Sequence, residues 1–110
     1  MPRISVSSHL PLQVEVDFQS RHRAGFRLFT RERADQDWKF VKEGIADTAT
    51  ILTPMRAGGA IKYEFLFFTE SHPFAAVIVF RQNGQMVENG LVSVEAPGNS
   101  QFITDTVELV

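Results

Sequence analysis

Five arginines lie close together between positions 21 and 33 and form the best candidate for a ligand-binding surface. This segment of thirteen residues contains one acid, Glu32, beside Arg21, Arg23, Arg27, Arg31 and Arg33. Its charge is +4 (five Arg minus one Glu), so the rest of the chain carries −6 within a formal total of −2. Guanidinium groups bind phosphate and sulfate through paired, charge-assisted hydrogen bonds. The cluster therefore points to an anionic ligand.

Arg27, Phe29 and Arg31 alternate with other residues, so a strand would place them on one face with a ring between two guanidinium groups. Such a surface suits a polyanion or single-stranded nucleic acid, which binds by stacking as well as by charge. The alternative is a solvated strand face whose arginines pair with acids and keep the sheet soluble. The acids considered for this role are Asp35, Asp37 and Glu15.

The only tryptophan, Trp38, lies beside Lys39 and near Asp35 and Asp37. Small β-sandwiches can present such a ring as a stacking platform for sugars, whereas a lone Trp in a short strand is otherwise a core residue. With Arg27, Phe29 and Arg31, Trp38 completes the set of candidate ligand-binding residues.

His72 follows Glu70 and Ser71, and a loop histidine near a carboxylate can act as an acid–base group. Asp47 is a further nominal carboxylate for such a site. Neighbouring side chains diverge, however, so Ser71 and His72 do not form a nucleophile–base pair, and no nucleophile elbow supports them. Because Pro73 follows, the segment is interpreted as a turn with an extended residue before the proline. We therefore expect no catalytic residue.

The metal-binding residue types are sparse. The three histidines, His9, His22 and His72, lack the spacing of a metal motif, and there is no cysteine. Asp35-Gln36-Asp37 resembles the start of a calcium loop but lacks the glycine and the distal glutamate. The sequence predicts no metal site and no cofactor.

The elements that must position these residues are short strands. The clearest contains Leu12, Val14, Val16 and Phe18 alternating with polar residues, as in a half-buried strand. The segment 60–80 holds five of the ten Phe residues and predicts two long core strands joined at Pro73. Asn83-Gly84 predicts a hairpin, and Asn89-Gly90 either a second hairpin around a short strand 85–88 or a loop. Further strands are expected at 3–8, 25–33, 37–44, 48–53, 91–95 and 101–109.

This gives seven to nine strands about ten residues apart, with turn signals between them and no convincing amphipathic helix. We predict an all-β fold, an antiparallel two-sheet β-sandwich of the immunoglobulin or fibronectin III kind, with a jelly roll as the alternative. One domain over residues 1–110 is expected, since the chain shows no linker or repeat.

Composition narrows the class of function. The net charge of −2 disfavours a strongly basic nucleic-acid binder, and the longest apolar run, the seven residues 74–80, is too short to insert into a membrane. The absence of cysteine and of a signal-like apolar run favours a cytosolic location. Surplus apolar residues on partly exposed faces, namely Phe29, Val41, Leu66 and Phe68, suggest a protein partner or a homo-oligomer.

We expect a non-enzymatic binding or interaction module that recognises a protein or glycan partner. Two alternatives stay open: an anion- or polyanion-binding domain that uses the Arg21–Arg33 stripe, and a small enzyme with loop acid–base residues around His72.

Overall fold

The computed structural model describes residues 2–19, 24–67, 73–96 and 102–110, and within them the chain forms nine β-strands and no helix. Alternating apolar residues and β-branched runs become strands, and the proline and glycine positions lie between them. The strands are β1 (Arg3–Ile4), β2 (Leu12–Phe18), β3 (Ala24–Arg31), β4 (Lys39–Gly44), β5 (Thr48–Leu52), β6 (Ala60–Phe67), β7 (Phe74–Gln82), β8 (Gln85–Ala96) and β9 (Phe102–Leu109).

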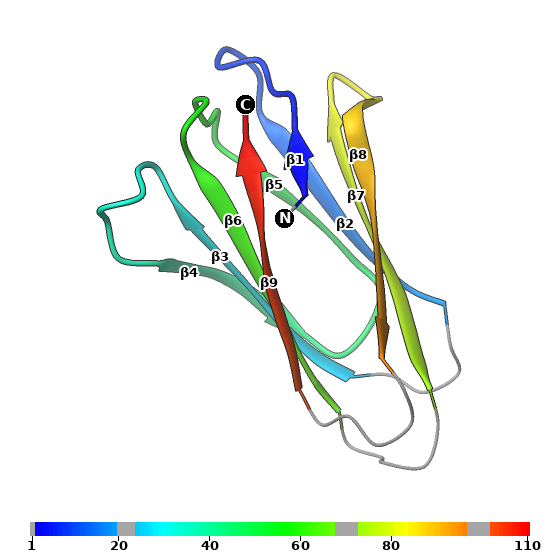
Figure 1. The fold of residues 1–110 in the computed structure, drawn as a ribbon. Helices are drawn as coiled ribbons and strands as arrows, with labels where there is room; N and C mark the ends of the chain where they lie inside the picture. Colours follow the sequence, from blue (N-terminus) through cyan, green and yellow to red (C-terminus); the bar gives the residue numbers. More distant parts are fainter. Residues whose placement is uncertain (1, 20–23, 68–72, 97–101) are drawn as a thin grey trace.

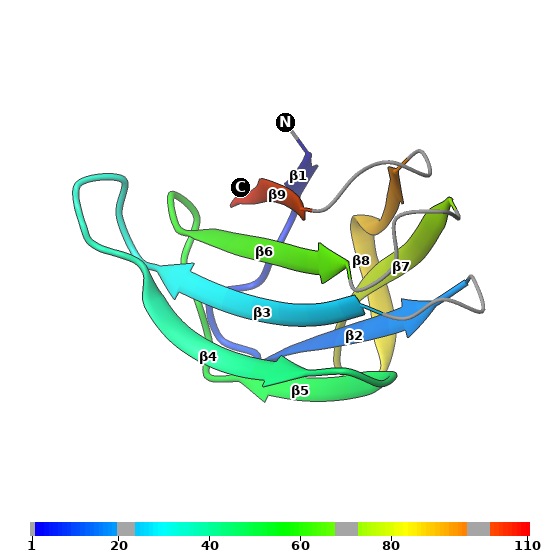
Figure 2. The ribbon, with the colours of Figure 1, turned by 90° about the horizontal axis from the view of Figure 1, so that it is seen from below.

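The strands form two sheets that face each other (Figures 1 and 2). The five-stranded sheet has the order β1-β9-β6-β3-β4, and the four-stranded sheet has the order β5-β2-β7-β8. All pairs are antiparallel except β1 with β9, which is parallel. The predicted all-β, two-sheet architecture is therefore confirmed, while its immunoglobulin or jelly-roll type stays a prediction.

The core lies between the two sheets. In β2, Val14 and Val16 point inward, and in β6 Tyr63 and Phe65 do the same. The predicted aromatic core exists as a cluster of rings whose centroids lie 5.2 to 6.4 Å apart, formed by Phe18, Phe26, Tyr63, Phe65 and Phe74. Because one row of each strand fills this core, the opposite row forms the outer face of its sheet.

The two Asn-Gly pairs differ in structure. Asn83 and Gly84 both have positive φ, 53° and 76°, as the predicted hairpin turn between β7 and β8 requires. At the second pair only Asn89 has positive φ, and β8 continues through it with a shift of register between Val79 and Arg81. The alternative of a separate short strand over 85–88 is wrong, since this stretch belongs to one twelve-residue strand.

One other expectation needs correction. The strand expected at 3–8 ends at Ile4, and the Gln82 side chain then binds the backbone of Ser7, accepting from its N–H at 2.8 Å and donating to its carbonyl at 2.9 Å. Leu66, which the sequence places on a partly exposed face, is 47% exposed because its row in β6 faces outward. Phe68 lies outside the described residues.

Candidate functional site

The outer face of the five-stranded sheet brings together all four candidate ligand-binding residues. In β3, Phe26 and Leu28 are buried in the core, so Arg27, Phe29 and Arg31 lie on the outer row, as the alternation predicted. Trp38 lies one residue before β4, the neighbouring strand, rather than inside a strand as expected.

Arg31 and Trp38 contact each other directly. The guanidinium carbon of Arg31 lies 4.2 Å from the centroid of the Trp38 ring, which is a cation–π contact. Phe29 lies between Arg27 and Arg31 on this outer row, and the Arg31 guanidinium lies over the indole of Trp38.

Lys62 of β6 joins this group, because the register places it opposite Phe29. Its amine lies 4.5 Å from the ring centroid of Phe29 and 5.3 Å from that of Trp38. The ring of Phe40 in β4 meets Phe29 edge-on at 5.9 Å and remains 51% exposed. We call this set the aromatic–cation patch, and its members are Arg27, Phe29, Arg31, Trp38, Phe40 and Lys62.

The charges on this face are unequally neutralised. Arg27 lies between Glu43 and Glu64 in the register, with its Nε 4.0 Å from the Glu43 carboxylate. The amine of Lys62 lies 3.9 Å from the Glu64 carboxylate. The ion pairs of the described residues include none to Arg31, whose buried Nε also has no hydrogen-bond partner. Arg31 is therefore the cation of this patch that is free to bind an external acceptor.

A hollow of about 390 Å³ adjoins the patch at the Arg27 end of the face. Gly25 and Gly44 are among its lining residues. A Cβ on Gly44 would lie 3.1 Å from the Phe26 ring, which is buried in the core, so Gly44 leaves space for that ring on the inner side of the sheet. Exposed apolar residues border it, and these are Ile45, Leu66 and Phe102. The hollow thus combines an apolar rim with the charged row of Arg27, Glu43 and Glu64.

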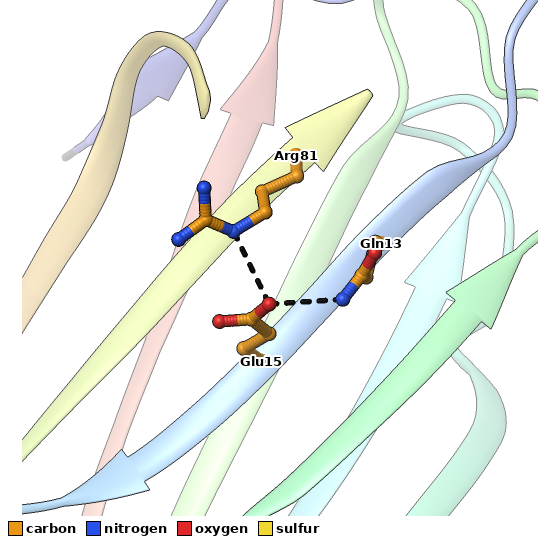
Figure 3. A network of polar contacts seen from close by, with 3 residues as sticks. All are labelled: Gln13, Glu15 and Arg81. Atoms are coloured by element: carbon orange, nitrogen blue, oxygen red, sulfur yellow. Dashed lines mark hydrogen bonds and ion pairs between the residues drawn. The ribbon is translucent and has the colours of Figure 1, made fainter. Parts of the chain in front are cut away.

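The proposed acid partners of the Arg stripe lie in different places. Arg33 pairs with Asp35, with 3.5 Å between Nε and the carboxylate. Glu15 is not a partner of the stripe, because β2 belongs to the other sheet. There its carboxylate accepts from Arg81 at 3.1 Å and from Gln13 at 2.9 Å (Figure 3). Beside this network Asp17 lies close enough to both Glu15 and Asp47 for the two carboxylates to raise its pKa, after the larger effect of burial.

Other predicted residues cannot be placed. Arg21, Arg23, His22 and the Glu70-Ser71-His72 segment lie outside the described residues. Within the described ranges no group of three His, Cys, Asp or Glu side chains could hold a metal ion. Nor does the described part of the chain contain a helix long and apolar enough to cross a membrane.

Phe40, Lys62, Leu66 and Phe102 were not identified as site residues from the sequence. Their places depend on which strands are neighbours and in which register, and one sequence carries no direct signal for either. Alternation alone placed Leu66 on the partly exposed row.

Comparisons of the chain with family models, with curated proteins and with solved structures find no match.

Proposed function

We propose that the protein is a non-enzymatic binding module that recognises a protein partner with the outer face of β9, β6, β3 and β4. The observation that carries this proposal is the aromatic–cation patch beside an apolar hollow on one open sheet face. Aromatic residues and arginine are the enriched anchors of protein interfaces, and such anchors work best next to a pocket that a partner side chain can fill.

The chemistry of the face indicates what the partner offers. A large apolar side chain fits the hollow between Leu66, Phe102 and Ile45, where it would cover three exposed side chains. A carboxylate near Arg31 would pair with its guanidinium group, which has no ion pair among the described residues. A partner segment with an apolar anchor and an acidic group a few residues away matches both features.

A glycan partner is less well supported by the same geometry. Sugars bind a tryptophan by stacking on the open ring face, but the Arg31 guanidinium already lies 4.2 Å from the centroid of this indole. A sugar on that side would have to displace a cation–π contact.

Binding can be tested by comparing four forms of the protein, the wild type and three variants, as immobilised bait in an extract of its source cells. Leu66→Asp and Phe40→Asp place charges in the hollow and in the patch, and both residues are half-exposed, so the fold should tolerate them. Leu91→Asp is the matched control, because Leu91 is 54% exposed on the outer face of the other sheet. We expect a protein that the wild type and Leu91→Asp retain and that both patch variants lose. Identical retention by all forms would contradict the proposal.

A second candidate function, polyanion binding, rests on the unpaired Arg31 and on its neighbour Lys62. Trp38 is the only tryptophan and contacts both cations, so its fluorescence reports binding directly. Heparin should change this fluorescence, and the affinity should fall with added salt. Arg31→Glu combined with Lys62→Glu should abolish the change. Arg27→Glu should have a smaller effect because two glutamates already flank Arg27. No fluorescence response to heparin at low salt would exclude this candidate.

Two expectations remain, an enzyme site around His72 and an immunoglobulin-like fold. His72 lies outside the described residues, so no geometry supports an enzyme site there. The immunoglobulin-like interpretation is supported by the adjacency of β3, β6 and β9, which is similar to the C, F and G strands of that fold. The position of β2 between β5 and β7 does not add to the similarity with the immunoglobulin fold.

A further inference from the structure

Strand β5 is an edge strand that lacks the usual protection against pairing with another chain. It pairs with β2 alone, through five consecutive residue pairs without a bulge. Its sequence, TATIL, has no charge, no proline and three β-branched residues. An exposed, regular, apolar edge of this kind is a template for strand addition.

The other three edge strands differ from β5 in this respect. Strand β4 carries Lys39, Lys42 and Glu43 and has a register shift against β3. Strand β1 has only two residues, one of them Arg3. Strand β8 carries Glu88 and Glu95, and its Glu88 carbonyl accepts a hydrogen bond from the Ser5 N–H. Charged residues, a short length or a bulge disfavour the pairing of these three edges with another chain, and β5 has none of these features.

Two features show that a second copy of the same strand fits this edge. On the outer face Ile51 is 73% exposed, and the smaller Ala49 stands two residues away on the same row. On the inner row Thr50 lies opposite Val14. The edge therefore offers a large apolar group beside a small one on its outer row, and uncharged residues on its inner row.

The sheet faces fix the register of such a pairing. A two-fold axis perpendicular to the sheet keeps outward residues outward, so Ala49 and Ile51 of one copy can only oppose outward residues of the other. A two-fold axis at Thr50 sets outward residues opposite outward residues and pairs all five residues of β5 with the second copy. Ala49 then opposes Ile51 of the second copy, and the two Thr50 residues lie opposite each other on the inner row.

We propose that β5 pairs antiparallel with β5 of a second copy about an axis at Thr50, joining two four-stranded sheets into one continuous sheet. This interface is separate from the outer face of the five-stranded sheet, so it does not depend on the proposed binding function.

Sedimentation equilibrium over a range of concentrations tests the association. The wild-type mass should rise with concentration from 12.4 kDa toward twice that value. Ala49→Lys combined with Ile51→Lys sets like charges opposite each other twice in the dimer and should leave a monomer. Leu91→Lys, at the far edge of the same sheet, should dimerise like the wild type. A wild type that stays monomeric at the highest soluble concentration, or a lysine variant that dimerises equally, overturns the proposal.

Disulfide trapping tests the register, because the chain has no cysteine of its own. Ala49→Cys and Ile51→Cys proteins, carrying tags of different size, should form a mixed disulfide dimer when oxidised together. Each variant oxidised alone should cross-link much less, since its thiols lie on opposite sides of the axis. Self-cross-linking of either variant at the rate of the mixture would overturn the axis at Thr50.

Discussion

Replacing Phe65 by alanine should destabilise the fold more than most single changes could. The Phe65 side chain is fully buried and lies at the centre of the aromatic cluster. Its ring centroid is 5.2 Å from that of Phe74, 5.9 Å from Tyr63, 6.1 Å from Phe18 and 6.4 Å from Phe26. Four ring contacts and the residue's whole buried surface are lost together in this variant.

The expected loss in the free energy of unfolding of Phe65→Ala follows from these contacts. Truncating a buried Phe to Ala costs about 3–5 kcal/mol, because a cavity replaces the ring. Ring pairs add about 0.5–1.5 kcal/mol each beyond their buried area, although such terms are not additive. We therefore expect a loss at the upper end, about 5 kcal/mol. Domains are stable by about 5–15 kcal/mol in all, so a large share of the stability would disappear.

Urea unfolding followed by circular dichroism measures this loss. Phe40→Ala is the control, since Phe40 is half-exposed and meets one ring, Phe29, at 5.9 Å. That control should lose about 1 kcal/mol. A loss below about 2 kcal/mol for Phe65→Ala, well under the usual cavity cost, would refute the described core.

Four further predictions concern single sites. Burial, reinforced by the Asp105 carboxylate, raises the pKa of Tyr63 to about 12. The folded state then keeps a proton that the unfolded state releases near the ordinary tyrosine pKa of 10.0, so stability is full below that pH and falls as the pH rises toward about 12. Phenolate absorbance should show that Tyr63 titrates well above the pH at which a free tyrosine does. Tyr63→Phe should remove both the absorbance change and the loss of folding stability at high pH. Burial, then Glu15 and Asp47, raises the pKa of Asp17 against the opposing effect of Arg81. Because the fold disfavours ionised Asp17, the stability that protonated Asp17 contributes is lost as the pH rises through its folded pKa. Solvent screens this partly exposed group, so Asp17→Asn should be only slightly more stable than the wild type in urea unfolding at neutral pH. A loss of stability in this variant would contradict the assignment. Gly90→Ala should cost about 1–3 kcal/mol, because its Cβ would lie 2.7 Å from the Val87 carbonyl oxygen and 2.8 Å from that of Phe80. Gly84→Ala meets no atom within 4 Å but has φ of +76°, so thermal melts should show a cost from backbone strain alone, about 1 kcal/mol.

The sequence predicted those parts of the fold that depend on local chemistry. Alternation alone identified Leu12–Phe18 with the observed bounds, and Asn83-Gly84 predicted its hairpin because positive φ at both positions is a local requirement. Asn89-Gly90 looks the same locally, but cross-strand contacts decide its structure. Gly90 is packed against the carbonyls of Phe80 and Val87, so the pair forms an irregularity within β8 rather than a turn.

The sequence predicted only the part of the candidate site that depends on the local alternation of residues. The outward row of Arg27, Phe29 and Arg31 follows from the period of one strand. The position of Lys62 between the Phe29 and Trp38 rings depends on the pairing of β3 with β6, which sets Lys62 opposite Phe29 although the two are 33 positions apart in the chain (62 minus 29). The hollow is lined by residues of β3, β4, β6 and β9, so it depends on the order of these strands in the sheet.

The parallel pairing of β1 with β9 has a consequence for the order of folding. Arg3 lies opposite Glu108, and backbone hydrogen bonds join Val6 to Val110 at 3.0 Å and Val110 to Ile4 at 2.9 Å. Figure 1 shows β1 beside β9. Contacts between such distant positions close the largest loop of the chain, and topologies rich in them fold slowly. We therefore expect the first strand to dock only after the last is in place. A circular permutant that links the two ends and opens the chain at Asn83-Gly84 would make this contact local and should fold faster into the same two sheets.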